Sequence, residues 1–206
     1  MVSNKQYLLA CSYLAPIGYY AILLQHTDCI IEQYDFFIKQ TIRNRCTILG
    51  ANGRLILSIP KKRKSSSKTI LKDIQISYDA PWQKLHWKSI TSAYRSSAYF
   101  EYYEDLFSPL YQKKEKFLVD FNGKLQKIVF NCLQTKDNST LSTYYQNETE
   151  KMDLRNHCFE LQEQEKYQQV FEGSCGFTTN LSIIDLLFNL GPETVDYLLN
   201  INLSTK

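Results

Sequence analysis

Apolar and polar positions change from strand-like to helix-like patterns along the chain. Residues 6–13 form a nearly continuous apolar run, and Ala15-Pro16-Ile17-Gly18 interrupts it. Residues 19–25 have the character of a short helix, and residues 29–34 form a second apolar run. The order strand, loop, helix, strand favours two parallel strands joined by a crossover.

Ligand sites in open sheets of this kind lie beyond the carboxyl ends of the strands. We therefore expect residues 14–18 and the segment after Tyr34 to be neighbours in a binding site. Tyr13 and Tyr19, which stand on either side of the Pro-Gly loop, would flank the pocket in that arrangement.

Residues 41–49 alternate with a period of two, which predicts a strand with an apolar face and a basic face. The apolar face carries Ile42, Asn44, Cys46 and Ile48, and the basic face carries Lys39, Thr41, Arg43, Arg45 and Thr47. Ala51-Asn52-Gly53 follows, and Asn-Gly is a strong hairpin signal. Residues 54–59 are the predicted return strand, which Pro60 ends.

The next segment predicts a loop, a short strand and an amphipathic helix. Residues 61–68 are basic and serine-rich, as in loops, and residues 72–78 read as a strand. Asp79-Ala80-Pro81 is a typical helix start. The helix that follows places Trp82, His86, Ser89 and Ala93 on one face and Lys84, Lys88, Thr91 and Arg95 on the opposite face.

The remaining residues predict mainly helices. We expect helices at 100–112 and 116–133, a polar loop at 135–150 and an exposed acidic stretch at 148–172. Asn180 would cap a helix through residue 190, with Gly191 ending it. The prediction is one α/β domain over residues 1–206. A mixed sheet with a β-hairpin forms the strand-rich part at 1–78, and the part at 79–206 is largely helical.

Composition narrows the class of protein. The 206 residues suit one domain, and no run reaches the ~18 apolar residues of a membrane helix. The start of the chain lacks the apolar core of a signal peptide, so we expect a cytoplasmic protein. Six cysteines without a Cys-x-x-Cys pair predict reduced thiols and no metal site. The sequence specifies neither a cofactor nor an oligomeric state.

Charge is distributed unevenly. The net charge is +3, but residues 39–72 hold ten basic residues and no acidic ones, which leaves −7 for the rest of the chain. A local positive field favours an anionic partner such as a phosphate, a nucleotide or a nucleic acid. The alternative is a solvated basic loop without a ligand.

The basic strand face is the first candidate site. Lys39, Arg43 and Arg45 would project side by side, and guanidinium groups match phosphate or carboxylate oxygens. The alternative is the solvent face of an antiparallel hairpin.

His86 is the second candidate. An imidazole near the centre of a packed helix face is either a general base at a cleft or a buried core histidine. Residues 96–105 hold three acids and three tyrosines, which suit a sugar pocket or the first turn of a helix.

Several segments resemble the WbqC-like protein family. They are Tyr13-Leu14-Ala15-Pro16-Ile17-Gly18-Tyr19-Tyr20, Lys39-Gln40-Thr41-Ile42-Arg43-Asn44-Arg45-Cys46-Thr47-Ile48, His86-Trp87, Ala93-Tyr94-Arg95, Tyr99-Phe100-Glu101-Tyr102-Tyr103, Val170-Phe171 and Asn180-Leu181-Ser182-Ile183-Ile184-Asp185-Leu186-Leu187-Phe188. The resemblance covers most of the chain in the same order. It implies a role in sugar or sugar-nucleotide modification in a bacterial cytoplasm, linked to surface-polysaccharide synthesis.

The favoured hypothesis is a transferase-like or ligand-binding protein for an anionic small molecule, such as a nucleotide-sugar. Lys39, Arg43 and Arg45 would hold phosphate oxygens, with Arg95 as a further binding residue, and His86 would act as a base or as a hydrogen-bond donor. One alternative is a non-catalytic scaffold with a tyrosine-rich surface. A nucleic-acid binding module that uses residues 61–68 is less favoured.

Overall fold

Two parallel strands joined by a helix form the centre of the structure. The computed structural model describes residues 6–62, 68–147, 151–159, 161 and 163–203. Strand β1 (Tyr7–Ala10) pairs in parallel with β2 (Cys29–Glu32), and helix α1 (Ile17–Gln25) connects them. The predicted crossover is therefore confirmed. Leu8 and Leu9 are fully buried, as expected for a strand covered on both faces.

Two very short strands complete this sheet. Strand β5 (Thr140–Leu141) pairs in parallel with β2, and β6 (Met152–Asp153) pairs in parallel with β1, so the order is β5-β2-β1-β6. The prediction of a plain loop at 135–150 and an exposed stretch at 148–172 is wrong at these points. A two-residue strand has no detectable period, and only its neighbour in space makes it a strand. All four carboxyl ends lie at the same edge of the sheet.

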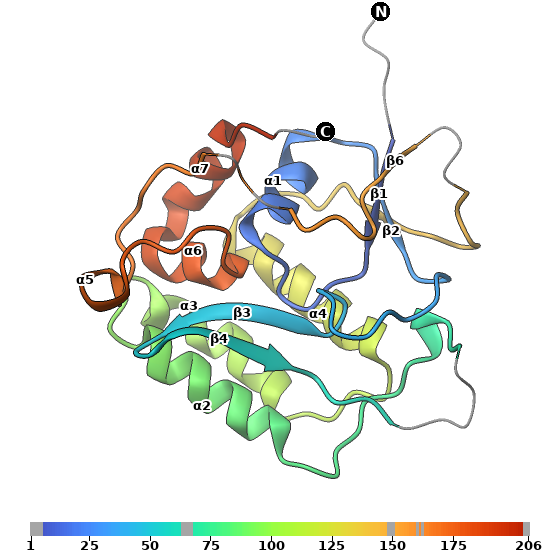
Figure 1. The fold of residues 1–206 in the computed structure, drawn as a ribbon, viewed down its shortest axis with the longest axis horizontal. Helices are drawn as coiled ribbons and strands as arrows, with labels where there is room; N and C mark the ends of the chain where they lie inside the picture. Colours follow the sequence, from blue (N-terminus) through green and yellow to red (C-terminus); the bar gives the residue numbers. More distant parts are fainter. Residues whose placement is uncertain (1–5, 63–67, 148–150, 160, 162, 204–206) are drawn as a thin grey trace, which may run out of the picture.

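The predicted hairpin is present beside this sheet, in the lower half of Figure 1. Strands β3 (Arg45–Gly50) and β4 (Gly53–Ser58) pair antiparallel from Arg45↔Ser58 to Gly50↔Gly53. The turn requires a positive φ of 98° at Gly53, a conformation that glycine adopts without strain.

The start of the first hairpin strand was predicted too early. Thr41 begins a turn, because its carbonyl oxygen accepts hydrogen bonds from the amides of Asn44 (3.3 Å) and Arg45 (3.1 Å). Lys39 and Arg43 precede the strand, so the prediction that they share one strand face with Arg45 is wrong. The alternation of residue types continued through the turn, but the hydrogen-bonded ladder did not.

The strand predicted at residues 72–78 is also wrong. A 3₁₀ helix, η1 (Leu71–Asp73), leads into single bridges of Gln75 to Phe117 and of Ile76 to Lys61. The apolar side chains of this segment are still buried. The hydrophobic pattern therefore identified the core residues correctly, but not their conformation.

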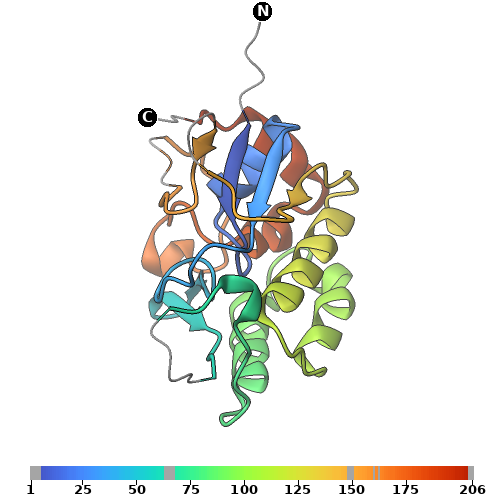
Figure 2. The same ribbon diagram turned by 90° about the vertical axis from the view of Figure 1, so that its right-hand side faces the viewer.

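Three helices cover the hairpin side of the molecule. They are α2 (Trp82–Tyr94), α3 (Phe100–Phe107), followed by the 3₁₀ turn η2 (Ser108–Tyr111), and α4 (Leu118–Cys132). Helix α2 lies beneath the hairpin, as Figures 1 and 2 show. Its buried face carries Trp82, His86 and Ala93, as predicted.

The C-terminal helices are α5 (Glu172–Cys175), α6 (Ile183–Leu190) and α7 (Thr194–Asn200), with the 3₁₀ turn η3 (Gly191–Glu193) between the last two. Gly191 ends α6 with a φ of 54°, which confirms the predicted stop. The predicted cap is wrong, because Ser182 holds the N-cap position and the Asn180 side chain bonds elsewhere. None of the described helices is both long and apolar enough to cross a membrane.

Candidate anion-binding site

A cavity of about 760 Å³ lies between the hairpin and the segments that follow β1, β2 and β6. Its lining includes Pro16 from the first loop and Ile38 from the segment after β2, so these two segments are neighbours, as the strand order predicted. The other lining residues are Gln40, Thr41, Ile42, Arg43, Arg45, Cys46, Thr47, Arg54, Ile56, Arg155, Asn156, His157, Cys158, Leu161, Thr179, Asn180 and Ser182.

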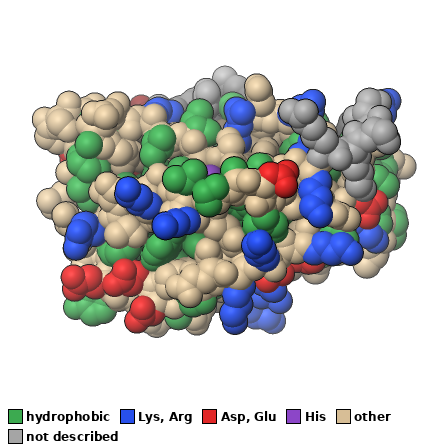
Figure 3. Space-filling model, turned by 90° about the horizontal axis from the view of Figure 1, so that it is seen from below, with side chains coloured by type: hydrophobic (Ala, Val, Ile, Leu, Met, Phe, Trp, Pro, Cys, Tyr) green, Lys and Arg blue, Asp and Glu red, His purple; other side chains and the backbone are tan. Residues whose placement is uncertain are grey.

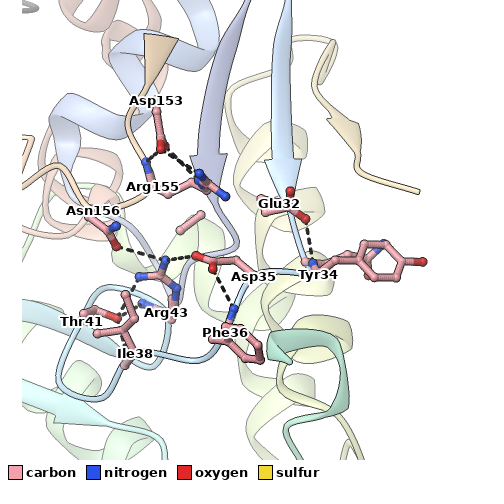
Figure 4. Close-up of polar contacts among 12 residues, drawn as sticks. Glu32, Tyr34, Asp35, Phe36, Ile38, Thr41, Arg43, Asp153, Arg155 and Asn156 are labelled. Atoms are coloured by element: carbon pink, nitrogen blue, oxygen red, sulfur yellow. Dashed lines mark hydrogen bonds and ion pairs between the residues drawn. The ribbon is translucent and has the colours of Figure 1, made fainter. Parts of the chain in front are cut away.

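Arg43 forms the buried floor of the cavity. Its side chain is 1% exposed, and its Nη2 donates to Asp35 Oδ2 at 3.0 Å and to Asn156 Oδ1 at 3.3 Å (Figure 4). Its Nε is buried with no hydrogen-bond partner among the described residues. Burial lowers the pKa of Arg43, and the Asp35 carboxylate opposes that effect. A guanidinium with an unmatched buried donor suits an anionic ligand.

Arg155 stands beside it at the end of β6. Its Nε and Nη2 bond to the two carboxylate oxygens of Asp153 at 2.9 and 2.8 Å, the fork geometry shown in Figure 4. The Asp153 hydrogen bonds raise the pKa of Arg155. The Tyr145 ring lies 5.3 Å from the guanidinium carbon. The side chain is therefore held in one orientation.

Two further arginines come from one face of the hairpin. The pairing of Thr47 with Ile56 places Arg45, Thr47, Arg54 and Ile56 on the same face, two residues apart on each strand. Arg54 Nη2 donates to the carbonyl oxygen of Thr179 at 3.3 Å, and Arg45 Nε is buried and has no hydrogen-bond partner in the described part of the chain. The predicted basic face of the hairpin is therefore confirmed for Arg45 and Thr47.

The charges in the cavity do not cancel. Among its described lining residues there are four arginines and no acidic side chain. Asp35 and Asp153 balance Arg43 and Arg155. In the part of the chain that the structure describes, Arg45 and Arg54 have no carboxylate within ion-pair distance. Among the described residues, the site therefore presents two positive charges without a carboxylate partner, and such charges attract an anion.

The segment after β6 was missed by the sequence analysis. Asn156, His157 and Cys158 line the cavity directly after Arg155. The available signal was a short basic and polar run inside an acidic region, together with the Asp153-x-Arg155 spacing. This signal indicates a site only when the pairing of β6 with β1 is known.

Tyr13 and His86 lie in the core and not among the cavity residues. Their exposed fractions are 0% and 6%, and His86 Nδ1 lies 3.0 Å from Tyr13 Oη. Tyr13 Oη is in turn 2.9 Å from Tyr111 Oη. Burial lowers the pKa of His86 to about 4. In the structure, the environment of His86 is therefore that of a hydrogen-bonded core histidine. This was one of the two interpretations that the sequence left open.

Other candidate residues are also outside the cavity lining. Tyr19 is 1% exposed, and its hydroxyl donates a hydrogen bond to the carbonyl oxygen of Ala10. It is therefore buried in the core and does not line the cavity. Lys39 and Arg95 are exposed, the latter at the end of α2. Tyr102 in the 96–105 segment is 76% exposed. Of the predicted binding residues, Arg43 and Arg45 meet in one cavity.

These features define an α/β protein with an arginine-lined cavity at the carboxyl edge of its parallel sheet. The model of the WbqC-like protein family matches residues 11–165 and 148–197, so the chain belongs to this family. A relative in Mycobacterium tuberculosis (strain ATCC 25618 / H37Rv), the uncharacterized protein Rv1507c, is 22% identical over 229 residues. That alignment covers 95% of this chain and 97% of the relative. No solved structure matches.

Proposed function

We propose that the protein binds a phosphate-bearing small molecule of the nucleotide-sugar class in the arginine-lined cavity. The observation that carries this proposal is the convergence of Arg43, Arg45, Arg54 and Arg155 on a cavity whose described lining holds no acid. Among the described residues, two of these charges have no carboxylate partner, which matches the two negative charges of a diphosphate ester. Planar guanidinium forks bind phosphate oxygens in pairs.

The surroundings of the arginines support a ligand with an organic part. Ile38, Ile56 and Leu161 provide apolar contact area for a sugar or a base. The cavity volume lies within the ~300–1,000 Å³ range of small-molecule sites. At the start of α1, the amides of Ile17 and Gly18 already donate to Leu181 and Asn180. The phosphate oxygens would therefore be bound by side chains.

The proposal extends to a role in modifying a sugar or nucleotide-sugar for surface-polysaccharide synthesis in the cytoplasm, as a transferase. The sequence motifs shared with the WbqC-like family motivate this part. A base within this cavity would have to come from its own lining, since His86 is hydrogen-bonded in the core. The catalytic role of His86 stays a prediction of the sequence.

Calorimetric titration with UDP, UDP-glucose and inorganic phosphate at one salt concentration tests the binding proposal. We expect UDP-glucose to bind, and Arg45→Ala to weaken binding about 10- to 100-fold, the effect of losing one hydrogen bond to a charged group. Arg95→Ala is the matched control, because that arginine is exposed outside the cavity lining. A folded protein that binds none of the probes, or equal losses in both variants, would contradict the proposal.

A second candidate, nucleic-acid binding, has two observations in its favour. Basic and hydrophobic side chains are mixed on the face seen in Figure 3. Lysine ammonium groups also lie over aromatic rings at Lys61–Phe37 (5.7 Å), Lys68–Phe36 (5.6 Å) and Lys72–Tyr34 (4.7 Å). Residues 63–67 of the basic run lie outside the described residues. Binding to a single-stranded oligonucleotide that weakens steeply with salt would favour this candidate.

A further inference from the structure

The ring of His157 is fixed in one orientation at the cavity wall. Its Nδ1 accepts a hydrogen bond from the amide of Phe159 at 2.8 Å, and its own amide donates to the carbonyl oxygen of Leu154 at 3.1 Å. The ring packs edge-on against Phe159, with centroids 5.1 Å apart and planes at 78°. A nitrogen that accepts a hydrogen bond carries no proton, so the neutral ring carries its proton on Nε2.

Phe159 anchors this arrangement from behind. Its side chain is 2% exposed and packs edge-on against Tyr19 at 5.3 Å. Its carbonyl oxygen accepts a hydrogen bond from Asn180 Nδ2 at 2.6 Å. The backbone at Phe159 has a φ of 56°, a conformation that a bulky residue adopts only when its surroundings impose it. The backbone beside His157 is therefore held by contacts with Tyr19 and Asn180.

His157 lines the cavity together with the four arginines, and Nε2 is its second ring nitrogen. Within the described parts of the chain, no protein group is hydrogen-bonded to Nε2 of His157. Its neighbour Asn156 is already bonded to Arg43, so the imidazole stands beside the arginines in the cavity lining. A fixed N–H donor in a positively charged cavity finds its natural partner in an anionic oxygen.

We propose that His157 donates its Nε2 proton in a hydrogen bond to a phosphate oxygen of the bound ligand, as a binding and orienting residue. This inference rests on the proposed function, because it uses the same cavity. It adds a directional donor to the guanidinium groups. The imidazole N–H adds one more fixed point at which an oxygen of the ligand must lie, beside the forks of the guanidinium groups.

Two substitutions separate a ligand contact from a purely structural role. In His157→Gln the amide nitrogen reaches the position of Nε2, but the side chain no longer offers an acceptor at the Nδ1 position. In His157→Asn the short side chain can still accept from the amide two residues later, as asparagine does in turns, but it does not reach the ligand. A ligand contact favours Gln over Asn, and a loop-holding role favours Asn over Gln.

The experiment is calorimetric titration of UDP into the wild-type protein and both variants at one salt concentration, with thermal melts to verify folding. We expect Asn to bind about 10-fold more weakly than wild type and Gln to stay within about 3-fold. Equal affinities of the Gln and Asn variants for UDP, or stronger binding by the Asn variant, would overturn the assignment. If the folded wild type binds no UDP or UDP-glucose, the proposed function itself fails, and this inference fails with it.

A measurement without ligand gives an independent check. Long-range proton–nitrogen correlation spectra of the imidazole distinguish the two neutral tautomers. We expect the Nε2-protonated form for His157 in the wild-type protein. A ring protonated on Nδ1 would overturn the assignment even if both variants failed to fold.

Discussion

Gly18 in the first turn of α1 lies directly against the backbone of Phe159, next to the lining residue Cys158. A Cβ atom at Gly18 would stand 2.6 Å from the carbonyl oxygen of Phe159. The Asn180 side chain joins the same two residues, because its Oδ1 accepts from the Gly18 amide and its Nδ2 donates to the Phe159 carbonyl. The helix and the segment that carries Arg155, Asn156 and His157 are therefore held together at a point where only glycine fits.

Gly18→Ala should lower the free energy of unfolding by about 1–3 kcal/mol, as overpacking against rigid backbone does. Gly123→Ala in α4 is the matched control, since a Cβ there meets nothing within 4 Å. That change should leave stability unchanged or raise it by up to ~1 kcal/mol, because alanine favours helices. Urea denaturation measures both. Equal effects in the two variants would show that the close approach does not restrict position 18.

The buried ion pair of Arg43 and Asp35 predicts that the stability losses from replacing the two residues are not additive. Asp35→Asn leaves the Arg43 guanidinium buried without its counter-ion, so we expect a loss of about 2–4 kcal/mol in unfolding free energy. Adding Arg43→Met removes the stranded charge, so the double variant should lose less than the sum of the single losses. Asp105→Asn on the exposed side of α3 is the control, with an expected change within about 0.5 kcal/mol. Additive losses would contradict the coupling.

His86 should make stability depend on pH. Its pKa is about 4 in the folded protein and 6.5 in the unfolded chain, because burial disfavours the charged ring. The unfolded state therefore binds more protons between these values, and the contribution of His86 to stability falls as pH drops from 6.5 towards 4, by up to about 3 kcal/mol. Chemical denaturation of the wild type and of His86→Leu over this range measures the effect. The same pH slope in both proteins would refute the assignment.

Asp185 should act in the opposite direction. Burial raises the pKa of Asp185 from 3.8 to about 6, although Tyr167, Tyr94 and Gln169 donate hydrogen bonds to its carboxylate. The folded state binds more protons between these values, so stability falls as pH rises from 3.8 to 6, by up to about 3 kcal/mol. Asp185→Asn should remove this slope. The two opposite contributions should nearly cancel in the wild type, so its unfolding free energy should change little between pH 4 and 6. His86→Leu should then show the slope due to Asp185, and Asp185→Asn the slope due to His86.

Cys158 is the thiol that reports on the cavity. It is exposed and lines the cavity, whereas Cys11, Cys29, Cys46 and Cys132 are buried. Burial raises the pKa of Cys11, Cys29 and Cys132 to about 12. A thiol reagent should modify native Cys158 first, and bound UDP-glucose should slow that reaction. Cys158→Ser identifies the signal, and a rate that nucleotide-sugar leaves unchanged at saturation would argue against occupancy of this cavity.

The sequence by itself determined the elements whose pattern is local. The Asn52-Gly53 turn, the buried face of α2 and the crossover from β1 to β2 follow from residue periodicity and turn chemistry. The basic face of the hairpin at Arg45 was also predictable, because alternation in a strand fixes which side chains share a face. Each of these depends on residues that are close together along the chain.

Only the tertiary structure decided which residues form the cavity. Strand β6 is two residues long and becomes a strand only by pairing with β1, and this pairing brings Arg155 and His157 beside Arg43. The turn at Thr41 moved Arg43 out of the strand and into the interior, where Asp35 compensates its charge. Packing of α2 against the core enclosed His86 with Tyr13, away from the arginines. These outcomes depend on contacts between distant segments, which no local pattern of residues encodes.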